Sequence, residues 1–292
     1  RYDGRDYGVP IDANLCAFFY DTQIFADLNL KVPTTFEELK TLCADLNAAD
    51  IIPISLANQS SWCGALFGEY IVDRIGGEQV FLNAANRTGS FADEAYVEAF
   101  RVMQEMADLN MFPMGFSGMS FDSGTSRNLL YTGKAAMQLM PSGIIPLAKA
   151  EAPEYAARLD AFVFPAIEGG TGDPSNLIGG VDSFSVTSTT KHPELACELL
   201  KYISDKNFAS DWITKAGRIA GVVGMDYGDG LNAKLVNLME TANASTIYYD
   251  QMLSPELGNY WNDVTQAVFS KAMTPEEAAA AMEAKAAELA AK

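Results

Sequence analysis

Residues 131–143 read YTGKAAMQLMPSG and contain, in close succession, a polar turn, an apolar run and a tight corner. Gly133 suits the turn, and AAMQLM is short and apolar enough for a buried strand. The corner after it consists of Pro141, Ser142 and Gly143, and small residues there leave room for close approach of other groups. We therefore expect a buried strand over residues 135–140 that ends in a compact corner.

Strand and helix patterns alternate on both sides of this stretch. The best helix start is in PTTFEELKTLCADL, where Thr34 or Thr35 can cap the helix and Glu37 and Glu38 lie in its first turn. Short apolar runs predict strands over 15–20, 51–58, 160–167 and 181–188, and helical periodicity is found over 62–75, 93–112 and 192–204. This alternation predicts an α/β fold in which helices cover the strands.

The last part of the chain is predicted to be mostly helical. From Leu231 onward helical patterns dominate, with a loop around YYDQMLSPELG. The final helix has Thr274 as its cap and Pro275 at its first position. No internal repeat or low-complexity linker marks a domain boundary, so any division into lobes must involve several chain crossings.

The composition and charge of the chain argue against nucleic acid, a membrane-spanning segment and a zinc site. The chain has 292 residues, 49% of them hydrophobic, and a formal net charge of -18 from 20 Lys and Arg against 38 Asp and Glu. Without a basic cluster, this charge disfavours nucleic acid and suits a neutral ligand. No apolar run of about 20 residues predicts a transmembrane segment. The cysteines are far apart, so we expect buried free thiols and no zinc site at positions 16, 43, 63 and 197.

The motifs of common enzymes are missing. Neither G-x-S-x-G nor G-x-x-x-x-G-K-[ST] occurs, and GFSGMSF lacks the last glycine of the former. The single histidine, His192, precedes a proline at a helix start, where a solvated role is expected. DYGDGLNAK lacks the terminal glutamate of a calcium loop. We therefore expect no catalytic residue, no metal and no cofactor, although a pair of carboxylates remains possible.

Aromatic residues beside polar groups are the better functional signal. Trp62 follows two serines, Tyr248 and Tyr249 precede Asp250, and Trp261 lies in a late helix. A flat aromatic face can pack against the C–H face of a sugar ring while nearby polar groups bind its hydroxyls. Core packing is the alternative for each of them, and it is strongest for Trp261, which is spaced with valines along its helix.

Read in order, several segments resemble the extracellular solute-binding proteins of ABC sugar importers, the family that includes maltose-binding protein. The resemblance begins in DGRDYGVPIDANLCAFFYDTQIFADLNLKVPTTFEELKTLCADL and continues through IGGEQ, the segment 116–143, LIGGVDSFSV, HPELACELLKYI and MTPEEAAAAMEAKA. Asp21, Asn29 and Phe36 replace the family's usual asparagine, glycine and tryptophan. The match covers essentially the whole chain, and its specificity comes from the order of the segments.

The resemblance implies a two-lobed fold of the periplasmic-binding-protein type, class II. The family carries about a hundred residues before the strand that YGVP resembles, so the first lobe is expected to be incomplete in this chain. The implied division is a hinge strand and first-lobe remnant at 1–11, a second lobe at 12–165 and 222–292, and a hinge crossing with a first-lobe segment at 166–221. Apolar surface in the helix that contains LLKYI would then lack a cover.

The resemblance also implies a ligand site between the lobes. Its expected contacts are Trp62, the corner residues Ser142 and Gly143, the hinge residues Asp12, Asn14 and Asp182, and the late residues Tyr249, Asp250 and Trp261. Asp182 follows two glycines at the hinge, where its carboxylate could accept two sugar hydroxyls. Ile144 and Ile145 stand where the family often has an aromatic residue.

The implied function is capture of a neutral sugar or oligosaccharide and its delivery to the membrane subunits of an ABC permease. The implied location is outside the cytoplasm, either periplasmic or lipid-anchored at the outer face of a bacterial membrane. A carbohydrate-active hydrolase with paired carboxylates is the alternative, and an interaction module without a small ligand is a third reading. A hydrolase would consume its sugar, and the module would bind none.

Overall fold

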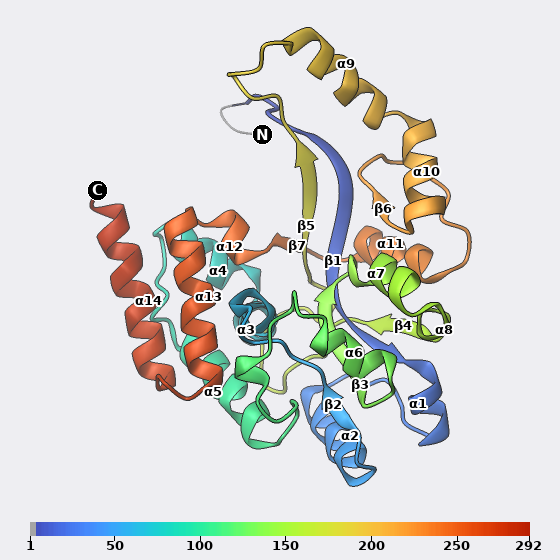
Figure 1. Ribbon diagram of the computed structural model, residues 1–292. Helices are drawn as coiled ribbons and strands as arrows, with labels where there is room; N and C mark the ends of the chain where they lie inside the picture. Colours follow the sequence, from blue (N-terminus) through green and yellow to red (C-terminus); the bar gives the residue numbers. More distant parts are fainter. Residues whose placement is uncertain (1–3) are drawn as a thin grey trace.

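One long strand organises the computed structural model, which describes residues 4–292 (Figure 1). This strand, β1, pairs with β3, β4, β5 and β6, and the sheet order along the main path is β2-β3-β1-β5-β7. The strand bounds are β1 Val9–Asp21, β2 Ile52–Ile54, β3 Ala135–Pro141, β4 Leu159–Phe162, β5 Leu177–Phe184, β6 Ile219–Ala220 and β7 Ser245–Ile247. The expected strand at 135–140 is therefore confirmed as β3.

The two halves of β1 belong to different parts of the molecule. Its inner half pairs antiparallel with β3, from Cys16 opposite Pro141 to Tyr20 opposite Met137, and also with β4. Its outer half pairs antiparallel with β5, with a register shift between Pro10 and Asp12, and briefly with β6. A single strand thus connects two regions, and a ligand held near its middle would contact both.

Helices surround the inner half of β1 and flank the outer half of the sheet (Figure 1). In chain order they are α1 Thr22–Asp27, α2 Phe36–Ala48, α3 Ser61–Gly76, α4 Glu78–Ala85, α5 Glu94–Asp108, a 3-10 turn Phe116–Gly118, α6 Thr125–Tyr131, α7 Ile144–Glu151, α8 Pro153–Ala156, α9 Pro193–Ile203, α10 Lys206–Ala216, α11 Leu231–Thr241, α12 Tyr249–Met252, α13 Pro255–Phe269 and α14 Pro275–Ala290. No helix within residues 4–292 is both long and apolar enough to cross a membrane.

Capping explains where the best-predicted helices begin. Thr35 caps α2, because its hydroxyl accepts a hydrogen bond from the Glu38 backbone N–H at 3.3 Å. Thr274 and Glu277 form a reciprocal capping box at the start of α14, with Pro275 at its first position. Both starts agree with the sequence prediction, which left Thr34 and Thr35 open for α2.

The larger part of the molecule, here called the body, consists of the inner half of β1 with β2–β4, α1–α8 and α12–α14. Its core includes α3, which packs against α5 and α13, while α14 packs against both of those helices. The α3 helix is buried from Cys63 to Arg74, and the Trp261 side chain of α13 is fully buried. The body therefore has its own extensive apolar core.

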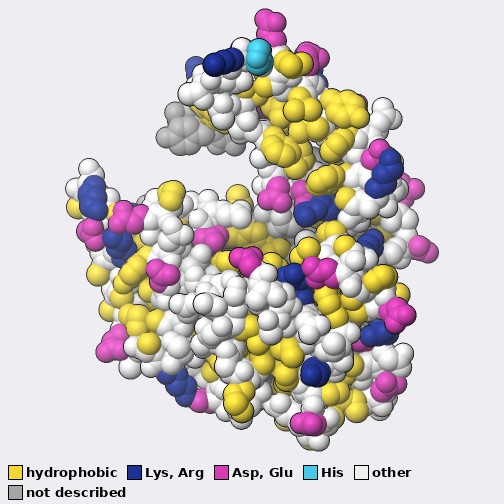
Figure 2. All heavy atoms as spheres, viewed as in Figure 1, with side chains coloured by type: hydrophobic (Ala, Val, Ile, Leu, Met, Phe, Trp, Pro, Cys, Tyr) yellow, Lys and Arg dark blue, Asp and Glu magenta, His cyan; other side chains and the backbone are white. Residues whose placement is uncertain are grey.

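The smaller part, here called the arm, consists of the outer halves of β1 and β5 with α9 and α10. On α9, the apolar residues Leu195, Leu199 and Tyr202 are 69%, 59% and 63% exposed, and the helix buries no residue. Apolar side chains gather on this upper part of the surface (Figure 2). The expected apolar surface around LLKYI is therefore confirmed, whereas the expected lobe boundaries stay predictions.

A buried arginine fixes the loop that leads from the body into β5. The Arg74 guanidinium donates hydrogen bonds to the carbonyl oxygens of Phe164 at 3.1 Å and Asn176 at 2.9 Å, and it forms an ion pair with Asp73. Nearby, the Tyr70 hydroxyl donates to the Cys16 carbonyl at 2.5 Å and accepts from the Ile178 N–H at 3.2 Å. The body thus holds β1 and β5 together where both strands leave it.

Two local predictions are wrong. The strand expected over 181–188 is β5, which runs from Leu177 to Phe184 and contains Gly179 and Gly180. A Cβ on Gly179 would lie 2.4 Å from the Asn14 carbonyl oxygen, which explains a glycine in this strand. Three cysteine thiols are buried as expected, but Cys197 lies exposed on α9.

Candidate functional site

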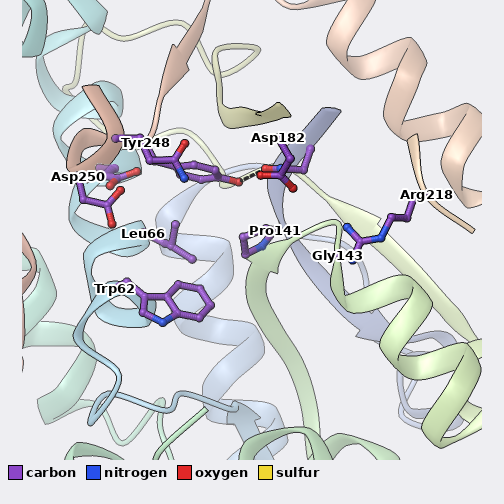
Figure 3. Close-up of a pocket in the computed structure, with 11 residues that line it drawn as sticks. Trp62, Leu66, Pro141, Gly143, Asp182, Arg218, Tyr248 and Asp250 are labelled. Atoms are coloured by element: carbon purple, nitrogen blue, oxygen red, sulfur yellow. Dashed lines mark hydrogen bonds between the residues drawn. The ribbon is translucent and has the colours of Figure 1, made fainter. Parts of the chain in front are cut away.

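A pocket of about 350 Å³ lies where the arm joins the body (Figure 3). It is bounded by α3, the end of β3, the middle of β1 and β5, the start of α12 and the segment before β6. Its lining residues are Asn14, Trp62, Leu66, Glu69, Pro141, Gly143, Asp182, Arg218, Tyr248, Asp250 and Gln251. Segments from six distant parts of the sequence therefore meet here.

Trp62 forms one wall of the pocket. It is the second residue of α3, half-buried, and its ring meets that of Phe121 edge-on at 5.1 Å between centroids. The Phe121 loop is held in turn by a 3.0 Å hydrogen bond from its backbone N–H to the Ser60 hydroxyl. Figure 3 shows the indole on the side of the pocket opposite Asp182 and Arg218. This wall therefore offers an aromatic surface, and the contact with Phe121 holds the indole in position.

Strands β1 and β5, with the start of α12, supply the polar wall. The Tyr248 hydroxyl donates a 2.8 Å hydrogen bond to the Asn14 side-chain oxygen, which ties the start of α12 to β1. Gly180 makes this possible, because a Cβ there would lie 2.9 Å from the Tyr248 ring. Two residues further along β5, Asp182 is exposed and lies opposite Asp12 in the ladder. Asn14 and Asp182 therefore both line the pocket.

An ion pair closes the side of the pocket next to the arm. Arg218, just before β6, pairs with Asp12 of β1, and its guanidinium lies 5.7 Å from the centroid of the Trp212 ring. Burial raises the pKa of Asp12 from its ordinary value, and the arginine opposes this. Asp12 and Ser142 line a crevice beside the pocket that is too small for a water molecule. These two expected contacts are thus adjacent to the pocket and not in its lining, whereas Gly143 lines both.

Two expected contacts lie in the core, so their predicted place at the ligand is wrong. Trp261 is fully buried and packs on Tyr96, Phe100 and Tyr249. Tyr249 is 1% exposed and stacks on Phe81 with 3.4 Å between ring centroids. Tyr249 thus anchors in the core the segment whose flanking residues, Tyr248 and Asp250, line the pocket. Asp250 does line the pocket, and its carboxylate accepts a 3.0 Å hydrogen bond from the Asn262 side chain.

Several residues that line the pocket were not predicted as ligand contacts, namely Leu66, Glu69, Pro141, Arg218, Tyr248 and Gln251. A signal existed for two of them, because Leu66 and Glu69 lie four and seven residues after Trp62 and so share its helical face. Arg218 had none, since its approach to Asp12 depends on the return of the chain through β6. Tyr248 was passed over for its neighbour, Tyr249.

The pocket combines an aromatic face, carboxylates and amide groups. Its carboxyl groups belong to Glu69, Asp182 and Asp250, and its one cation among the described lining residues, Arg218, is already paired. Within the part of the chain that the structure describes, no group of three or more acidic, histidine or cysteine side chains could hold a metal ion. Such a lining suits an uncharged ring with several hydroxyl groups.

Comparisons with known proteins agree with this architecture. The model of the family described as bacterial extracellular solute-binding protein matches residues 1–207. The chain is 25% identical over 268 residues to the multiple sugar-binding protein of Streptococcus mutans serotype c. This match covers 90% of this chain and 60% of the relative. It is 23% identical over 273 residues to a putative binding protein of Brucella abortus, which covers 93% of this chain and 62% of that protein.

Solved structures share the fold over nearly the whole chain. One comes from work on xylan utilization by the thermophilic bacterium Caldanaerobius polysaccharolyticus, with a TM-score of 0.89, 29% identity, and coverage of 97% of this chain and 74% of the other. A chitin oligosaccharide binding protein gives a TM-score of 0.90 at 21% identity, covering 100% and 74%. The fold is therefore that of the class II periplasmic binding proteins, as expected.

This chain spans about 60% of the length of the curated relatives. The family model nevertheless matches well over half of the chain, and the fold, the long shared strand and the pocket at its middle agree with that match. The chain belongs to the family of bacterial extracellular solute-binding proteins.

Proposed function

We propose that this chain is the ligand-binding part of a carbohydrate receptor that serves an ABC importer. The observation that carries the proposal is the pocket at the joint, where the Trp62 indole faces polar groups of β1, β5 and α12. A sugar ring could pack its C–H face on the indole while Asn14, Asp182 and Asp250 bind its hydroxyls. Motion of the arm about β1 would then close the pocket around the sugar.

The relatives support a carbohydrate as the ligand. One curated relative is named a multiple sugar-binding protein, and one structural neighbour is named a chitin oligosaccharide binding protein. Another neighbour, with 16% identity and a TM-score of 0.78, is a sugar transporter structure from Bacillus licheniformis in complex with stachyose. The paired state of the pocket's arginine favours a neutral sugar over an anionic one.

The remaining parts of the proposal follow from membership in the family. The receptor would work outside the cytoplasm, in the periplasm or anchored by a lipid at the outer face of the membrane. It would release its sugar to the permease subunits without cleaving it, so we propose no catalytic residue, metal or cofactor.

A thermal-shift screen of the full chain tests the proposal. The sugars to use are xylo-oligosaccharides, chito-oligosaccharides, galactose and stachyose, with amino acids and calcium as controls. A ligand that binds only the folded state raises the melting temperature, by an amount that grows with its concentration above Kd. We expect a shift with one class of neutral sugar. The absence of a shift with every sugar would contradict the proposal, whether or not an amino acid or calcium gives one.

The hydrolase alternative makes a separate prediction. A sugar that shifts the melting temperature is incubated with the protein and then analysed by chromatography. A receptor leaves it intact, whereas a hydrolase with paired carboxylates converts it slowly and loses this activity when one carboxylate is replaced by its amide.

A further inference from the structure

Glu69 is an unusual group at the inner end of the pocket. It lines the pocket from α3, yet the residue is only 1% exposed. Its Oε1 accepts a 3.1 Å hydrogen bond from the Tyr249 backbone N–H, while its Oε2 is buried and has no hydrogen-bond partner among the described residues. A buried carboxylate oxygen without a partner destabilises the folded state, so the group needs either a ligand or a proton.

Among the described residues, no cation neutralises Glu69 from the elements packed around it. Asp250 of α12 lines the same pocket and adds a second negative charge, and the lining's arginine is engaged by Asp12. The other titratable or polar groups that face Glu69 are neutral, namely Cys16 of β1, Tyr248 and Tyr249 at the start of α12, and Trp261 of α13. The indole N–H of Trp261 faces the Glu69 carboxyl group and has no other hydrogen-bond partner in the described part of the chain.

Two effects favour the protonated form of this side chain. Burial raises the pKa of Glu69 well above its ordinary value, and the charge of Asp250 raises it further. The hydrogen bond from Tyr249 and the nearby Trp261 indole oppose this shift but are weaker causes. A protonated carboxyl group differs from a carboxylate because it can donate a hydrogen bond as well as accept one.

We propose that Glu69 is a neutral carboxylic acid at neutral pH and that, with the Asp250 carboxylate beside it, it recognises the sugar through one donor and one acceptor. The inference rests on the proposed function and deepens it. Oε2 has to turn from its buried position toward the pocket. The acid O–H would then donate to a ring oxygen or a hydroxyl oxygen, and Asp250 would accept from a neighbouring hydroxyl. Such a pair suits a neutral sugar and disfavours one that carries a carboxylate, which would face Asp250 without a counter-charge.

The protonation state can be tested without any sugar. Between the ordinary pKa of glutamate and the raised pKa of Glu69, the folded protein holds a proton that the unfolded chain releases, so stability falls as pH rises through this window. Glu69→Gln lacks this proton, and Glu154→Gln, at an exposed position, is the matched control. As pH rises above the ordinary pKa of glutamate, the melting temperature of the wild type should fall relative to that of Glu69→Gln and stay parallel to that of the control. Parallel curves for all three proteins would overturn the proposal.

A second measurement does not need the variant to fold. In the wild type labelled with carbon-13 at glutamate carboxyl groups, one resonance should keep the position of the protonated acid at about pH 7. If every glutamate resonance has the position of a carboxylate at that pH, the proposal is wrong.

The role in recognition is tested with the oligosaccharide that gives the largest thermal shift in the screen. Wild-type affinity should fall by up to tenfold for each pH unit above the pKa of Glu69. Glu69→Ala should weaken binding at every pH, and Glu69→Gln, which keeps an N–H donor, should restore binding and remove the pH dependence. Affinity that rises with pH would contradict the donor role. Because the sugar-free experiments stand alone, a failed screen would sink the proposed function without deciding the state of Glu69.

Discussion

Apolar residues are buried in the helices of the body but exposed on helix α9 of the arm. In the body, α3 buries apolar and charged side chains alike and packs against α5 and α13. In the arm, α9 has the apolar stripe of an amphipathic helix, yet residues of that stripe are exposed to solvent and the helix buries no residue. Burial of apolar surface is the main source of folding free energy, so the body must supply most of the stability.

This difference explains where the pocket lies. The body provides rigid parts, namely Trp62 and Glu69 on α3 and the supported start of α12. The opposite wall comes from Asp182 on the arm's strand β5 and from Arg218 in the segment that follows α10. A site built at such a joint has one fixed wall and one wall that can move with the arm.

The largest expected effect is in the core of the body. Trp261→Ala removes a fully buried ring that packs on three other aromatic residues, so it should lower the free energy of unfolding by about 3 to 5 kcal/mol. Urea unfolding followed by circular dichroism measures this loss. A loss below about 1 kcal/mol would mean that the body does not dominate stability.

At the joint, we expect an intermediate effect on binding. A Cβ in Gly180→Ala would lie 2.9 Å from the Tyr248 ring and would displace the hydroxyl that binds Asn14. Sugar affinity should fall by about 1 to 3 kcal/mol in calorimetry. Gly118→Ala is the control, because nothing lies within 4 Å of a Cβ there. Equal affinities of the two variants would show that the Tyr248 position does not matter.

Within the body, one carboxylate should produce a measurable pH dependence. Glu283 of α14 accepts hydrogen bonds from Arg87 and from the Phe91 backbone N–H, and its pKa is lowered to about 2, chiefly by Arg87. The lowered pKa stabilises the fold above the ordinary value of 4.5, and this contribution is lost as pH falls through about 2.

Glu283→Gln should therefore cost about 1 to 2 kcal/mol at neutral pH, and the difference from the wild type should disappear in strong acid. Unfolding at several pH values, with exposed Glu94→Gln as the control, measures the trend. A difference that persists unchanged down to about pH 2 would contradict this assignment.

The smallest effect is expected on the arm. Leu199→Ser replaces an exposed side chain of α9, so the free energy of unfolding should change by about 0.5 kcal/mol or less. A loss comparable to that of Trp261→Ala would show that α9 is covered in solution, and analytical ultracentrifugation would then reveal whether a second copy covers it.

Much of the fold was predictable because its signals are local. The α2 and α14 helices carry their own caps, and β3 is a short apolar run between turns. The position of β5 was not predictable in this way, because its two glycines are required by Asn14 and Tyr248, which lie far away in the sequence. Contacts with residues far away in the sequence therefore require glycine at these two positions.

The site was only partly predictable for a related reason. Trp62 stands beside serines at a helix start, and its exposure could be inferred from that setting. Adjacent residues point in different directions, however, so the sequence alone could not tell which of Tyr248 and Tyr249 faces the pocket. Trp261 has the helical spacing of a core residue, and the structure confirms that alternative.

In the proposed receptor a sugar binds at the joint against Trp62, and calorimetry of Trp62→Ala measures the contribution of this contact. With the sugar identified by the screen, the variant should stay folded and bind about 1 to 3 kcal/mol more weakly than the wild type, because the ring loses its apolar partner. An affinity equal to that of the wild type would remove Trp62 from the site and contradict the account.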